Sequence, residues 1–485
     1  MAGEAGSAPG PAVVRRVKVD AVSADAAVLR ARRRRRAAFR FGWADLLGPI
    51  GIGSVVAVVC LWLRNEGLAS LTGDPGVVGS LGLLAGLVCA DLMVLQVVLM
   101  ARIPWVERAW GHDVLARRHR WVGFASFWLM VTHIALFTAD RLSRDGGSGW
   151  SRLWALFVTD PWMLFATVGA IMLVGVVVSS IRRARRRLRY ESWHLLHLYA
   201  YLGIAFTFPH QLADGAEFHD PVTRAYWWTL YLVAASAILV FRIGLPLWRS
   251  AYHRMRVAEV RTEAPGVVSV GIAGHRLDRL RAKSGQFFIW RFLDGPGWSR
   301  GNPYTMSAAP VGDRLRVTIQ AAGDGSARAA TLRPGARVLI EGPYGTLTAE
   351  RRVHPRMLLL ASGVGITPMR ALLEDAPYAP GETALIYRFT SAEHAIFTTE
   401  LDEIAARRGV QLHYVPGPRR ADGSWLPVGF DPDLDDVTAL RALVPDIADR
   451  DIFVCGPPKW ICAVRKAVAQ AGALRHQVHS EDFAW

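Results

Sequence analysis

Six stretches of mostly apolar residues lie in the first half of the chain, each about the 20 residues that a helix needs to cross the ~30 Å hydrocarbon core of a bilayer. Each is therefore a predicted transmembrane span. No comparable stretch follows Trp248, which predicts that the second half is soluble in water. The predicted spans are Trp43 to Leu63, Gly76 to Met100, Trp121 to Ala139, Pro161 to Ile181, Ser192 to Phe208 and Tyr226 to Trp248.

Arginine is distributed unevenly between the segments that flank these spans. The chain carries 57 Lys and Arg against 41 Asp and Glu, a net charge of +16 that suits either nucleic acid or a membrane surface. Short cytoplasmic loops of membrane proteins retain Lys and Arg, and here the basic segments fall on every second loop. We therefore predict a multi-pass protein of the plasma (cytoplasmic) membrane with both termini cytoplasmic, and no nucleic acid as partner. The basic segments are Arg32 to Arg36, Arg102 to Arg120, Arg182 to Arg189 and Arg249 to Arg256.

The soluble half changes character near residue 350. Short β-type runs separated by Gly and Pro predict a small antiparallel barrel, and the later alternation of strands with helices predicts a Rossmann-like α/β domain with a parallel sheet. The predicted domains are a disordered basic lead (1–40), a six-helix membrane bundle (41–250), the β-barrel (251–350) and the nucleotide-binding α/β domain (351–485). The predicted strands are Val267 to Ile272, Phe287 to Phe292, Leu315 to Ile319, Met357 to Ala361, Ala384 to Tyr387, Gln411 to Val415 and Asp451 to Val454, and the predicted helices begin near Pro368, Thr399 and Lys459.

Four histidines form two pairs on the third and fifth predicted spans. Ligating side chains inside a span are costly, so they are functional candidates. His119 and His133 are 14 residues apart and nearly share a helix face, whereas the 13 residues between His197 and His210 require a local distortion of the helix. Both intervals cover ~20 Å along a helix. We therefore predict one level of ligands near each membrane face, His119 with His197 inside and His133 with His210 outside.

Two imidazoles at each level suit the axial ligation of a haem iron, whereas zinc prefers four ligands. The histidine pairs therefore predict two haem groups. His194, one short turn before His197, is an alternative ligand on the same helix. Hydrogen bonding between helices is the competing interpretation for any one of these histidines alone.

Two motifs in the predicted barrel have the composition of a flavin site. In Asn302 to Ser307 (NPYTMS) an aromatic ring that can cover an isoalloxazine stands beside hydroxyls that can bond its polar edge. In Gly323 to Ser326 (GDGS) a glycine-rich turn offers backbone N–H groups to a pyrophosphate. The predicted cofactor-binding residues here are Asn302, Tyr304, Thr305, Ser307, Gly323, Gly325 and Ser326.

Two further motifs predict a dinucleotide site in the last domain. Leu360 to Met369 (LASGVGITPM) runs from an apolar strand through two glycines to a helix start, where the helix dipole favours phosphate. Cys455 to Pro458 (CGPP) ends another strand, at the edge where parallel sheets bind ligands. The predicted binding residues are Gly363, Gly365, Thr367, Pro368, Gly456 and Pro457.

From about Trp43 to Trp485 the chain resembles the superfamily of ferric reductases and NADPH oxidases. The resemblance implies that cytoplasmic NADPH, or NADH, gives a hydride to FAD, which passes single electrons through two b-type haems to an acceptor outside. It rests on the order and spacing of the four paired histidines, Asn302 to Ser307, Gly342 to Gly345 (GPYG), Ser362 to Met369, Cys455 to Pro457 and Glu481 to Phe483 (EDF).

The resemblance also assigns roles to single residues. Asn302 stands where the family usually carries an Arg or His that meets the pyrophosphate, with Arg300 nearby as a substitute. The family's terminal aromatic covers the flavin; Phe483 matches it, and Trp485 offers a second ring. These two aromatics and Cys455 are the predicted catalytic residues. Arg388, at the end of a predicted strand, is either a partner for the 2′-phosphate of NADPH or a solvated surface arginine.

The acceptor defines three hypotheses. The leading one is an NAD(P)H-driven reductase of an external ferric complex, and an oxidase that reduces dioxygen to superoxide is the alternative of the same class. An electron-transfer module that serves a partner protein is the alternative of a different class. Membrane lipid and an accessory protein are the other expected partners.

Overall fold

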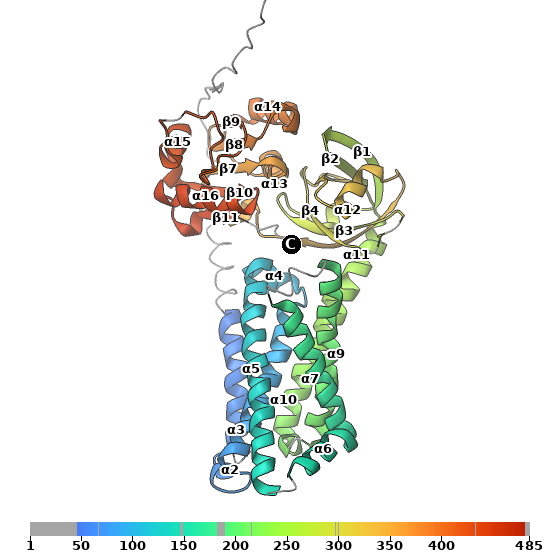
Figure 1. The fold of residues 1–485 in the computed structure, drawn as a ribbon. Coiled ribbons are helices and arrows are strands. Elements are labelled where there is room, and N and C mark those ends of the chain that lie inside the picture. The colour runs from blue at the N-terminus through green and yellow to red at the C-terminus, as the bar shows by residue number, and fades with distance from the viewer. Residues whose placement is uncertain are drawn as a thin grey trace, which may run out of the picture. The chain divides into compact units, whose positions relative to one another are not determined.

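The computed structural model describes residues 46–65, 67–145, 149–181, 190–214, 216–295, 297–298, 300–431 and 433–480. The predicted basic lead (1–40) and the basic segment Arg182 to Arg189 lie outside these residues. The chain forms two compact units, which Figure 1 shows as a helical part and a part built from sheets. The helical unit comprises Ala44–Val106 and Val114–Ile243, and the sheet unit comprises Glu107–Asp113 and Gly244–Trp485.

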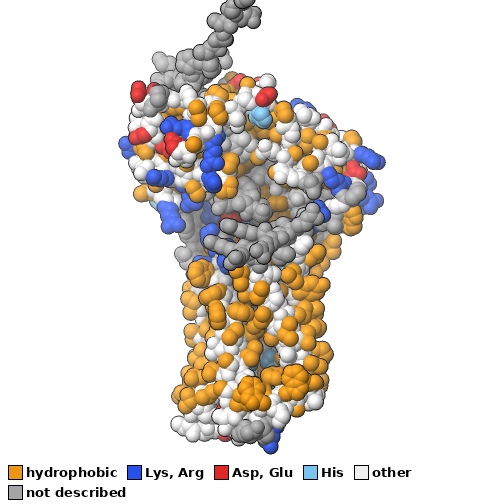
Figure 2. Space-filling model, in the orientation of Figure 1, with side chains coloured by type: hydrophobic (Ala, Val, Ile, Leu, Met, Phe, Trp, Pro, Cys, Tyr) orange, Lys and Arg blue, Asp and Glu red, His pale blue; other side chains and the backbone are white. Residues whose placement is uncertain are grey.

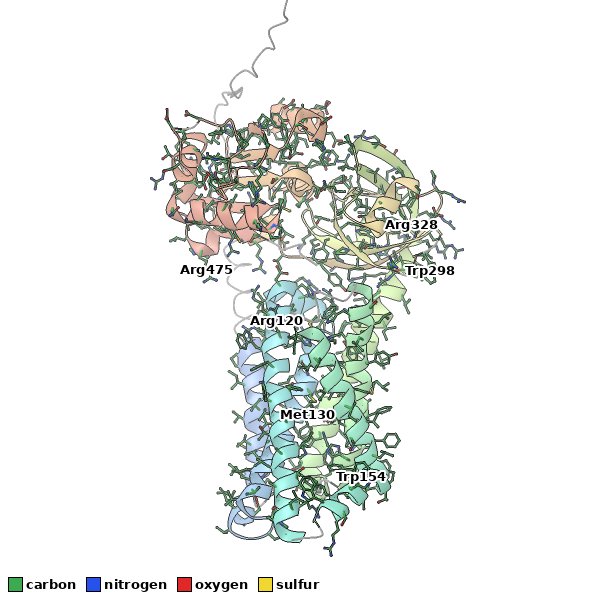
Figure 3. The ribbon with its side chains drawn as sticks, viewed as in Figure 1. Arg120, Met130, Trp154, Trp298, Arg328 and Arg475 are labelled. Atoms are coloured by element: carbon green, nitrogen blue, oxygen red, sulfur yellow. The ribbon has the colours of Figure 1, made fainter. Side chains whose placement is uncertain are left out.

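Five described helices are long and apolar enough to cross a membrane. They match the first, second, third, fourth and sixth predicted spans. Large apolar side chains cover the outside of the helical unit (Figure 2), and Trp154 on α6 (Gly149–Thr159) points outward from it (Figure 3). The five are Leu46–Arg64, α3 (Gly76–Leu99), α5 (His112–Asp145), α7 (Pro161–Ser180) and the continuous helix Pro221–His253, which contains α10 (Pro221–Ala237), η3 (Ile238–Gly244) and α11 (Leu245–His253).

The fifth predicted span forms α9 (Tyr190–Asp214), a helix of 25 residues that is not among those five. Its histidines, tyrosines and threonine make it less apolar than its neighbours. It packs closely on α7, because a Cβ atom on Gly169 would lie 2.7 Å from the carbonyl oxygen of Gly203. The sixth membrane span therefore stays a prediction. Short helical segments also occur among the described residues before α10: α2 (Ala69–Thr72), α4 (Pro104–Trp110), α6 and η2 (Ala216–His219).

The first part of the sheet unit is a six-stranded antiparallel sheet in the order β4-β3-β6-β1-β2-β5. Its edges meet through an isolated bridge between Met306 and Val317, so the sheet curves back without a continuous closing ladder. An antiparallel sheet is confirmed, and a closed barrel is not. The strands are β1 (Arg256–Ala264), β2 (Val267–Ala273), β3 (Phe287–Leu293), β4 (Asn302–Thr305), β5 (Arg314–Gln320) and β6 (Arg337–Tyr344).

The second part is a five-stranded parallel sheet in the order β11-β10-β7-β8-β9, which confirms the predicted α/β pattern. Its central strands read as unbroken apolar runs because helices cover both faces. All carboxyl ends of the strands lie along one edge. The elements are β7 (Arg356–Ser362), α13 (Ile366–Asp375), β8 (Thr383–Phe389), α14 (Thr398–Arg408), β9 (Gln411–Pro416), α15 (Asp436–Leu443), β10 (Arg450–Cys455), α16 (Pro458–Gln470) and β11 (Val478–Ser480).

Candidate functional site

The helical unit brings the imidazole rings of His119 on α5 and His197 on α9 together in an edge-to-face arrangement. Their ring centroids lie 6.0 Å apart and their planes are inclined by 71°. Imidazole nitrogens about 2 Å on either side of a metal ion would place two ring centroids about 6 Å apart. The spacing therefore suits one metal ion between the rings. The histidine that the structure places beside His119 in this way is His197.

The Nδ1 atoms of three of the four histidines have fixed partners. His119 Nδ1 lies 3.3 Å from the Gln96 carbonyl oxygen, and His133 Nδ1 lies 2.8 Å from that of Gly82, both on α3. His197 Nδ1 lies 3.3 Å from Ser180 Oγ. A carbonyl oxygen can only accept, so Nδ1 carries the proton in His119 and His133, and Nε2 keeps a lone pair for a ligand.

His133 and His210, the predicted second pair, are close enough to influence each other electrostatically. A Cβ atom on Gly86 would lie 2.7 Å from His133 Nδ1, so the absence of a side chain there lets the ring lie against α3. His210 follows Pro209, which stands inside α9. Because proline lacks the N–H of a helical residue and distorts the helix, it supplies the distortion that the 13-residue interval requires.

These sites differ from the metal sites that need more ligands. Within the described part of the chain, no group of three or more His, Cys, Asp or Glu side chains is arranged to hold a metal ion. Structural zinc sites use four such ligands and catalytic ones three. The paired imidazoles are thus suited to a group that brings its own equatorial ligands.

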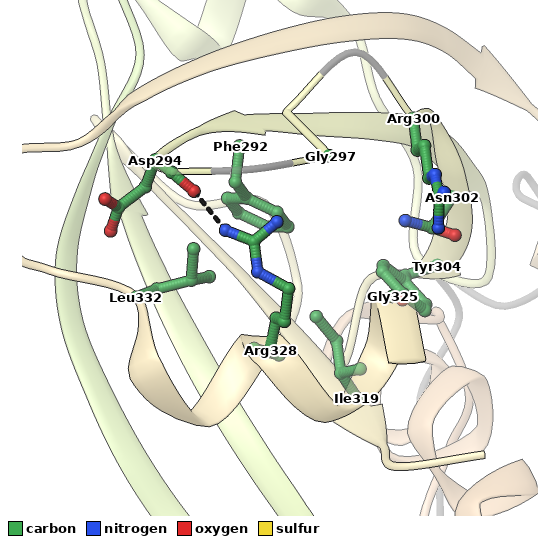
Figure 4. A pocket seen from close by; sticks show the side chains of 11 residues that line it. Phe292, Asp294, Gly297, Arg300, Asn302, Tyr304, Ile319, Gly325, Arg328 and Leu332 are labelled. Carbon is green, nitrogen blue, oxygen red and sulfur yellow. Dashed lines mark hydrogen bonds between the residues drawn. The ribbon is translucent and has the colours of Figure 1, made fainter. Parts of the chain in front are cut away.

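A cavity of about 180 Å³ in the antiparallel sheet holds parts of both predicted flavin motifs (Figure 4). Gly325 lies next to the side chain of Asn302: a Cβ atom on Gly325 would be 3.7 Å from the amide nitrogen and oxygen of Asn302. Burial raises the pKa of Tyr304 to about 12, so its phenol stays neutral. The lining residues are Phe292, Asp294, Gly297, Arg300, Asn302, Tyr304, Ile319, Gly325, Arg328, Ala329 and Leu332.

Arg328 is a cavity residue that the sequence analysis missed. Its guanidinium lies in the cavity and donates a hydrogen bond to the backbone carbonyl of Asp294. It adds a cation beside Arg300, where the chain has Asn302 in place of the family's basic residue. Its position two residues after the GDGS turn was the only indication in the sequence.

Other predicted flavin residues brace the motifs. Ser307 is fully buried, and its hydroxyl accepts a hydrogen bond of 2.7 Å from Thr318. Ser326 Oγ closes its own turn by accepting from the N–H groups of Ala322 and Gly323 at 2.8 and 3.0 Å. Thr305 is buried and paired to β3 in the ladder. These groups hold the shape of the site, and Gly323 belongs to the same turn.

The predicted dinucleotide motifs meet at the carboxyl edge of the parallel sheet. A Cβ atom on Gly365 would lie only 2.3 Å from the carbonyl oxygen of Cys455, so the turn η7 (Gly363–Gly365) after β7 approaches the end of β10 closely. Gly363 adopts φ +57°, a conformation that favours glycine. Cys455 is buried, with 3% of its surface exposed. Thr367 and Pro368 are buried in the first turn of α13, and Pro457 precedes α16.

Arg388 ends β8 at this same edge and is not a solvated surface arginine. Only 6% of its surface is exposed, and its Nε and Nη2 atoms have no hydrogen-bond partner among the described residues. Burial lowers its pKa, and the charge of Arg419 lowers it further. Two neighbouring cations with unused donors make a site for an anion. Arg419 follows β9, and the sequence analysis missed it.

An ionic network joins the flavin motif to the helix after the glycine loop. Glu400 on α14 accepts two hydrogen bonds from Arg316 on β5, at 2.9 and 2.8 Å, and one from Arg370 on α13 at 2.7 Å. Both guanidiniums also donate to the Ser307 carbonyl, at 3.1 and 3.4 Å. Burial would raise the pKa of Glu400, but the hydrogen bonds and charges of the two arginines outweigh it and hold the pKa below its ordinary value.

The predicted terminal residues Phe483 and Trp485, and the motif Glu481 to Phe483, lie outside the described residues.

Comparison with known proteins matches two segments of the chain to families. Residues 85–208 match the ferric reductase-like transmembrane component, and residues 359–466 match the oxidoreductase NAD-binding domain. The chain is therefore a fusion of these two kinds of domain, as the resemblance implied. It combines helices that are long and apolar enough to cross a membrane with an oxidoreductase NAD-binding module.

Individual relatives resemble about half of the chain. The ferredoxin reductase component of 3-ketosteroid-9-alpha-monooxygenase from Mycolicibacterium smegmatis is 32% identical over 211 residues, which cover 42% of this chain and 57% of that protein. The glycine betaine monooxygenase reductase subunit from Chromohalobacter salexigens is 27% identical over 245 residues, 49% of this chain and 65% of that protein. The chain thus matches less than two thirds of the length of either relative.

Among solved structures, the flavohaem-like FAD/NAD-binding domain of nitric oxide dioxygenase from Vibrio cholerae O1 biovar El Tor aligns with a TM-score of 0.39. The alignment has 22% identity and covers 48% of this chain and 98% of that domain.

Proposed function

We propose that this protein moves electrons from cytoplasmic NAD(P)H through FAD and two bis-histidine haems to an acceptor on the other side of the plasma membrane, most directly a ferric complex. The observation that carries the proposal is the pair His119 and His197, whose ring centroids lie 6.0 Å apart. A chain with a nucleotide-binding module needs an electron path of this kind if its acceptor is outside, because a hydride cannot cross ~30 Å of hydrocarbon.

The histidine side chains supply the axial ligands in this proposal. His119 and His197 serve the level nearer the cytoplasm, and His133 and His210 the outer level. A haem iron held in this way carries one electron at a time. The α3 carbonyl groups of Gln96 and Gly82 bind Nδ1 of the α5 imidazoles, which leaves the Nε2 lone pairs as the proposed ligands. This role requires α9 to cross the membrane beside α7, which would make it the sixth span.

The sheet unit supplies the binding sites for the electron donor. A bound flavin accepts a hydride and releases single electrons. Arg300, Asn302, Tyr304 and Arg328 would hold it at the cavity. Thr305, Ser307, Gly323, Gly325 and Ser326 shape the loops around it, and Phe483 or Trp485 is proposed to cover the ring.

The glycine loop at the carboxyl edge of the parallel sheet would bind NAD(P)H. Gly363, Gly365, Thr367, Pro368, Gly456 and Pro457 form the surface for its pyrophosphate, next to Cys455. Arg388 and Arg419 would bind the 2′-phosphate, because a buried guanidinium with unused donors gains most from an anion. We therefore propose NADPH as the preferred donor. The Glu400 network is a positioning device, since it holds the flavin motif against α13.

The test uses the purified full-length protein in vesicles that enclose the acceptor, with NADPH added outside. A ferric complex inside should be reduced at a rate that superoxide dismutase does not change. If the vesicles instead reduce an enclosed superoxide indicator without any iron, and superoxide dismutase abolishes that signal, the acceptor is dioxygen. This result would contradict the ferric proposal.

A second candidate is a module that passes electrons to a partner protein. The relatives named above favour it, because they are reductase components of monooxygenases. In this case NADPH should reduce the purified protein, and neither a ferric complex nor dioxygen should turn over until a partner is added. Turnover of ferric complex by the purified protein alone would exclude it.

A further inference from the structure

Helix α11 has two faces of opposite character. One face packs on β6, where Ser250 Oγ accepts from Ile340 N at 3.1 Å and Arg249 donates to the Gly342 carbonyl. On the other face, Leu247 and Trp248 are 60% and 58% exposed, and Trp248 stacks on Tyr252 with ring centroids 5.3 Å apart. The sheet unit therefore presents an apolar, aromatic strip along the end of the long helix Pro221–His253.

Four exposed arginines lie at the end of α11 and in the segment after β2: Arg254, Arg276, Arg279 and Arg281. The segment after β2 returns to the end of α11, because His275 N donates to the His253 carbonyl at 2.6 Å. Arg279 Nη1 donates to the Tyr252 hydroxyl at 3.2 Å, and Arg276 also hydrogen-bonds it. None of the four arginines forms an ion pair with a carboxylate in the described part of the chain.

The backbone at these positions does not explain the choice of arginine. Arg254, Arg276 and Arg281 have φ values of 45°, 48° and 52°. This left-handed region is unfavourable for residues with a Cβ atom, and Gly or Asn adopts it at lower cost. The local backbone therefore does not favour arginine at these three positions.

Membrane topology alone does not explain them either. Lys and Arg orient a membrane protein when they lie within about 15–20 residues of a span. Arg254 satisfies this condition, but Arg276, Arg279 and Arg281 lie more than 20 residues beyond His253. It is the fold that brings them back to the helix end.

We propose that the strip Leu247–Trp248–Tyr252 and the four arginines form a surface that binds the headgroups of anionic phospholipids. Aromatic side chains favour the membrane–water interface, and basic clusters next to a transmembrane helix attract anionic lipids. The long helix places this surface where the chain leaves the bilayer. The partner is the adjoining membrane leaflet, which would anchor the sheet unit by this edge.

The experiment compares hydrogen exchange of the full-length protein in nanodiscs of phosphatidylcholine alone and in nanodiscs with added phosphatidylglycerol. We expect exchange in residues 245–256 and 274–283 to slow about fivefold with the anionic lipid. We expect high salt to remove this protection, because it screens exposed charges. Equal exchange in the two lipids, or protection that high salt leaves intact, would overturn the proposal. This salt test needs no variant.

The variant test replaces Arg276 and Arg281 by Asn, which tolerates the left-handed backbone, and Arg279 by Gln. The matched control replaces three exposed basic residues elsewhere in the sheet unit: Arg465→Gln, Lys466→Gln and Arg475→Gln. The first variant should lose the lipid-dependent protection, and the control should keep it. Protection that survives in the first variant, or is lost in both, would contradict the assignment. Neither result depends on the proposed cofactors or acceptor.

Discussion

The helical unit and the sheet unit each hold an acidic side chain between several elements, and the partners of that side chain differ in kind between the two units. Asp91 on α3 has no exposed surface, and its Oδ1 accepts from Ser54 Oγ at 2.6 Å and from the Tyr226 hydroxyl at 2.9 Å. Glu400 in the sheet unit is held by two arginines. Neutral hydroxyls join three apolar helices without adding charge, whereas the ionic network couples two sheets in a region that water can reach.

The same contrast governs how the two units shape their sites. In the helical unit, backbone carbonyls of α3 orient the histidines, and Gly86 makes room for a side chain. In the sheet unit, the missing side chain of Gly365 makes room for the backbone of Cys455 and Gly456. A side chain can shift when it is crowded, and a strand inside a sheet cannot. The sheet unit should therefore tolerate added volume less well.

Substituting Gly365 and Gly86 by Ala tests this difference and should give the largest effect. Gly365→Ala places a methyl group 2.3 Å from the Cys455 carbonyl oxygen, which should destabilise the sheet unit by about 3 kcal/mol. Gly86→Ala meets the His133 ring and should cost less in stability. Thermal unfolding measures both, with Gly323→Ala as a stability control, because a Cβ atom there meets nothing within 4 Å. A smaller loss of stability for Gly365→Ala than for Gly86→Ala would contradict the claim that the sheet unit tolerates added volume less well.

Neutralising the two carboxyl groups should give the next largest difference. Glu400→Gln removes the carboxylate that Arg316 pairs with and leaves Arg370 with Glu374 alone, and we expect a loss of about 2–3 kcal/mol. Asp91→Asn keeps an oxygen that accepts from Ser54 and Tyr226, and we expect a loss of about 1 kcal/mol or less. Chemical denaturation followed by tryptophan fluorescence separates these cases. Equal losses would show that charge does not distinguish the two clusters.

Removal of the buried cation at the edge of the parallel sheet should change nucleotide preference. Arg388→Ala should raise the KM for NADPH about tenfold, the effect of one lost charge-assisted hydrogen bond. The KM for NADH should stay unchanged, because NADH carries no 2′-phosphate. Arg419→Ala should act in the same direction. Steady-state reduction of a soluble dye measures these constants, and an equal rise for both nucleotides would contradict the assignment.

The pH dependence of stability should show the smallest effect. The pKa of Glu400 lies below its ordinary value of 4.5 in the folded protein. Its contribution is therefore complete above about pH 4.5 and is lost as the pH falls through the lowered folded value. Glu400→Gln should flatten this part of the profile of Tm against pH between pH 5 and pH 3. If the variant and the unmodified protein lose Tm equally as the pH falls, Glu400 does not contribute to the pH dependence of stability.

Local patterns predicted much of the fold. The strands of the parallel sheet appear as unbroken apolar runs because both faces are covered, and β7, β8, β9 and β10 are confirmed. Elements without such a pattern were missed, among them β1, β6 and α15. In the helical unit, the polar residues that make α9 a candidate for ligation also lower its apolar character. The same histidines that indicate a ligand site therefore weaken the prediction of a membrane span.

The candidate site was predictable where residues lie close in sequence and not where the fold assembles them. The intervals between the histidines predicted which helices would face each other, and His119 does face His197. Arg328 and Arg419 reach their sites only through tertiary packing. Glu400 meets Arg316 across 84 positions of sequence, and no local pattern marks such a pair.

The measurement that tests the central claim most directly is the haem content of the purified full-length protein, from its visible spectrum and a pyridine haemochrome assay. We predict two b-type haems per chain, one in His133→Ala, and two in the control His194→Ala. A protein without a haem spectrum, or a haem content that His133→Ala leaves unchanged, would contradict the proposal that paired histidines carry the electrons across the membrane.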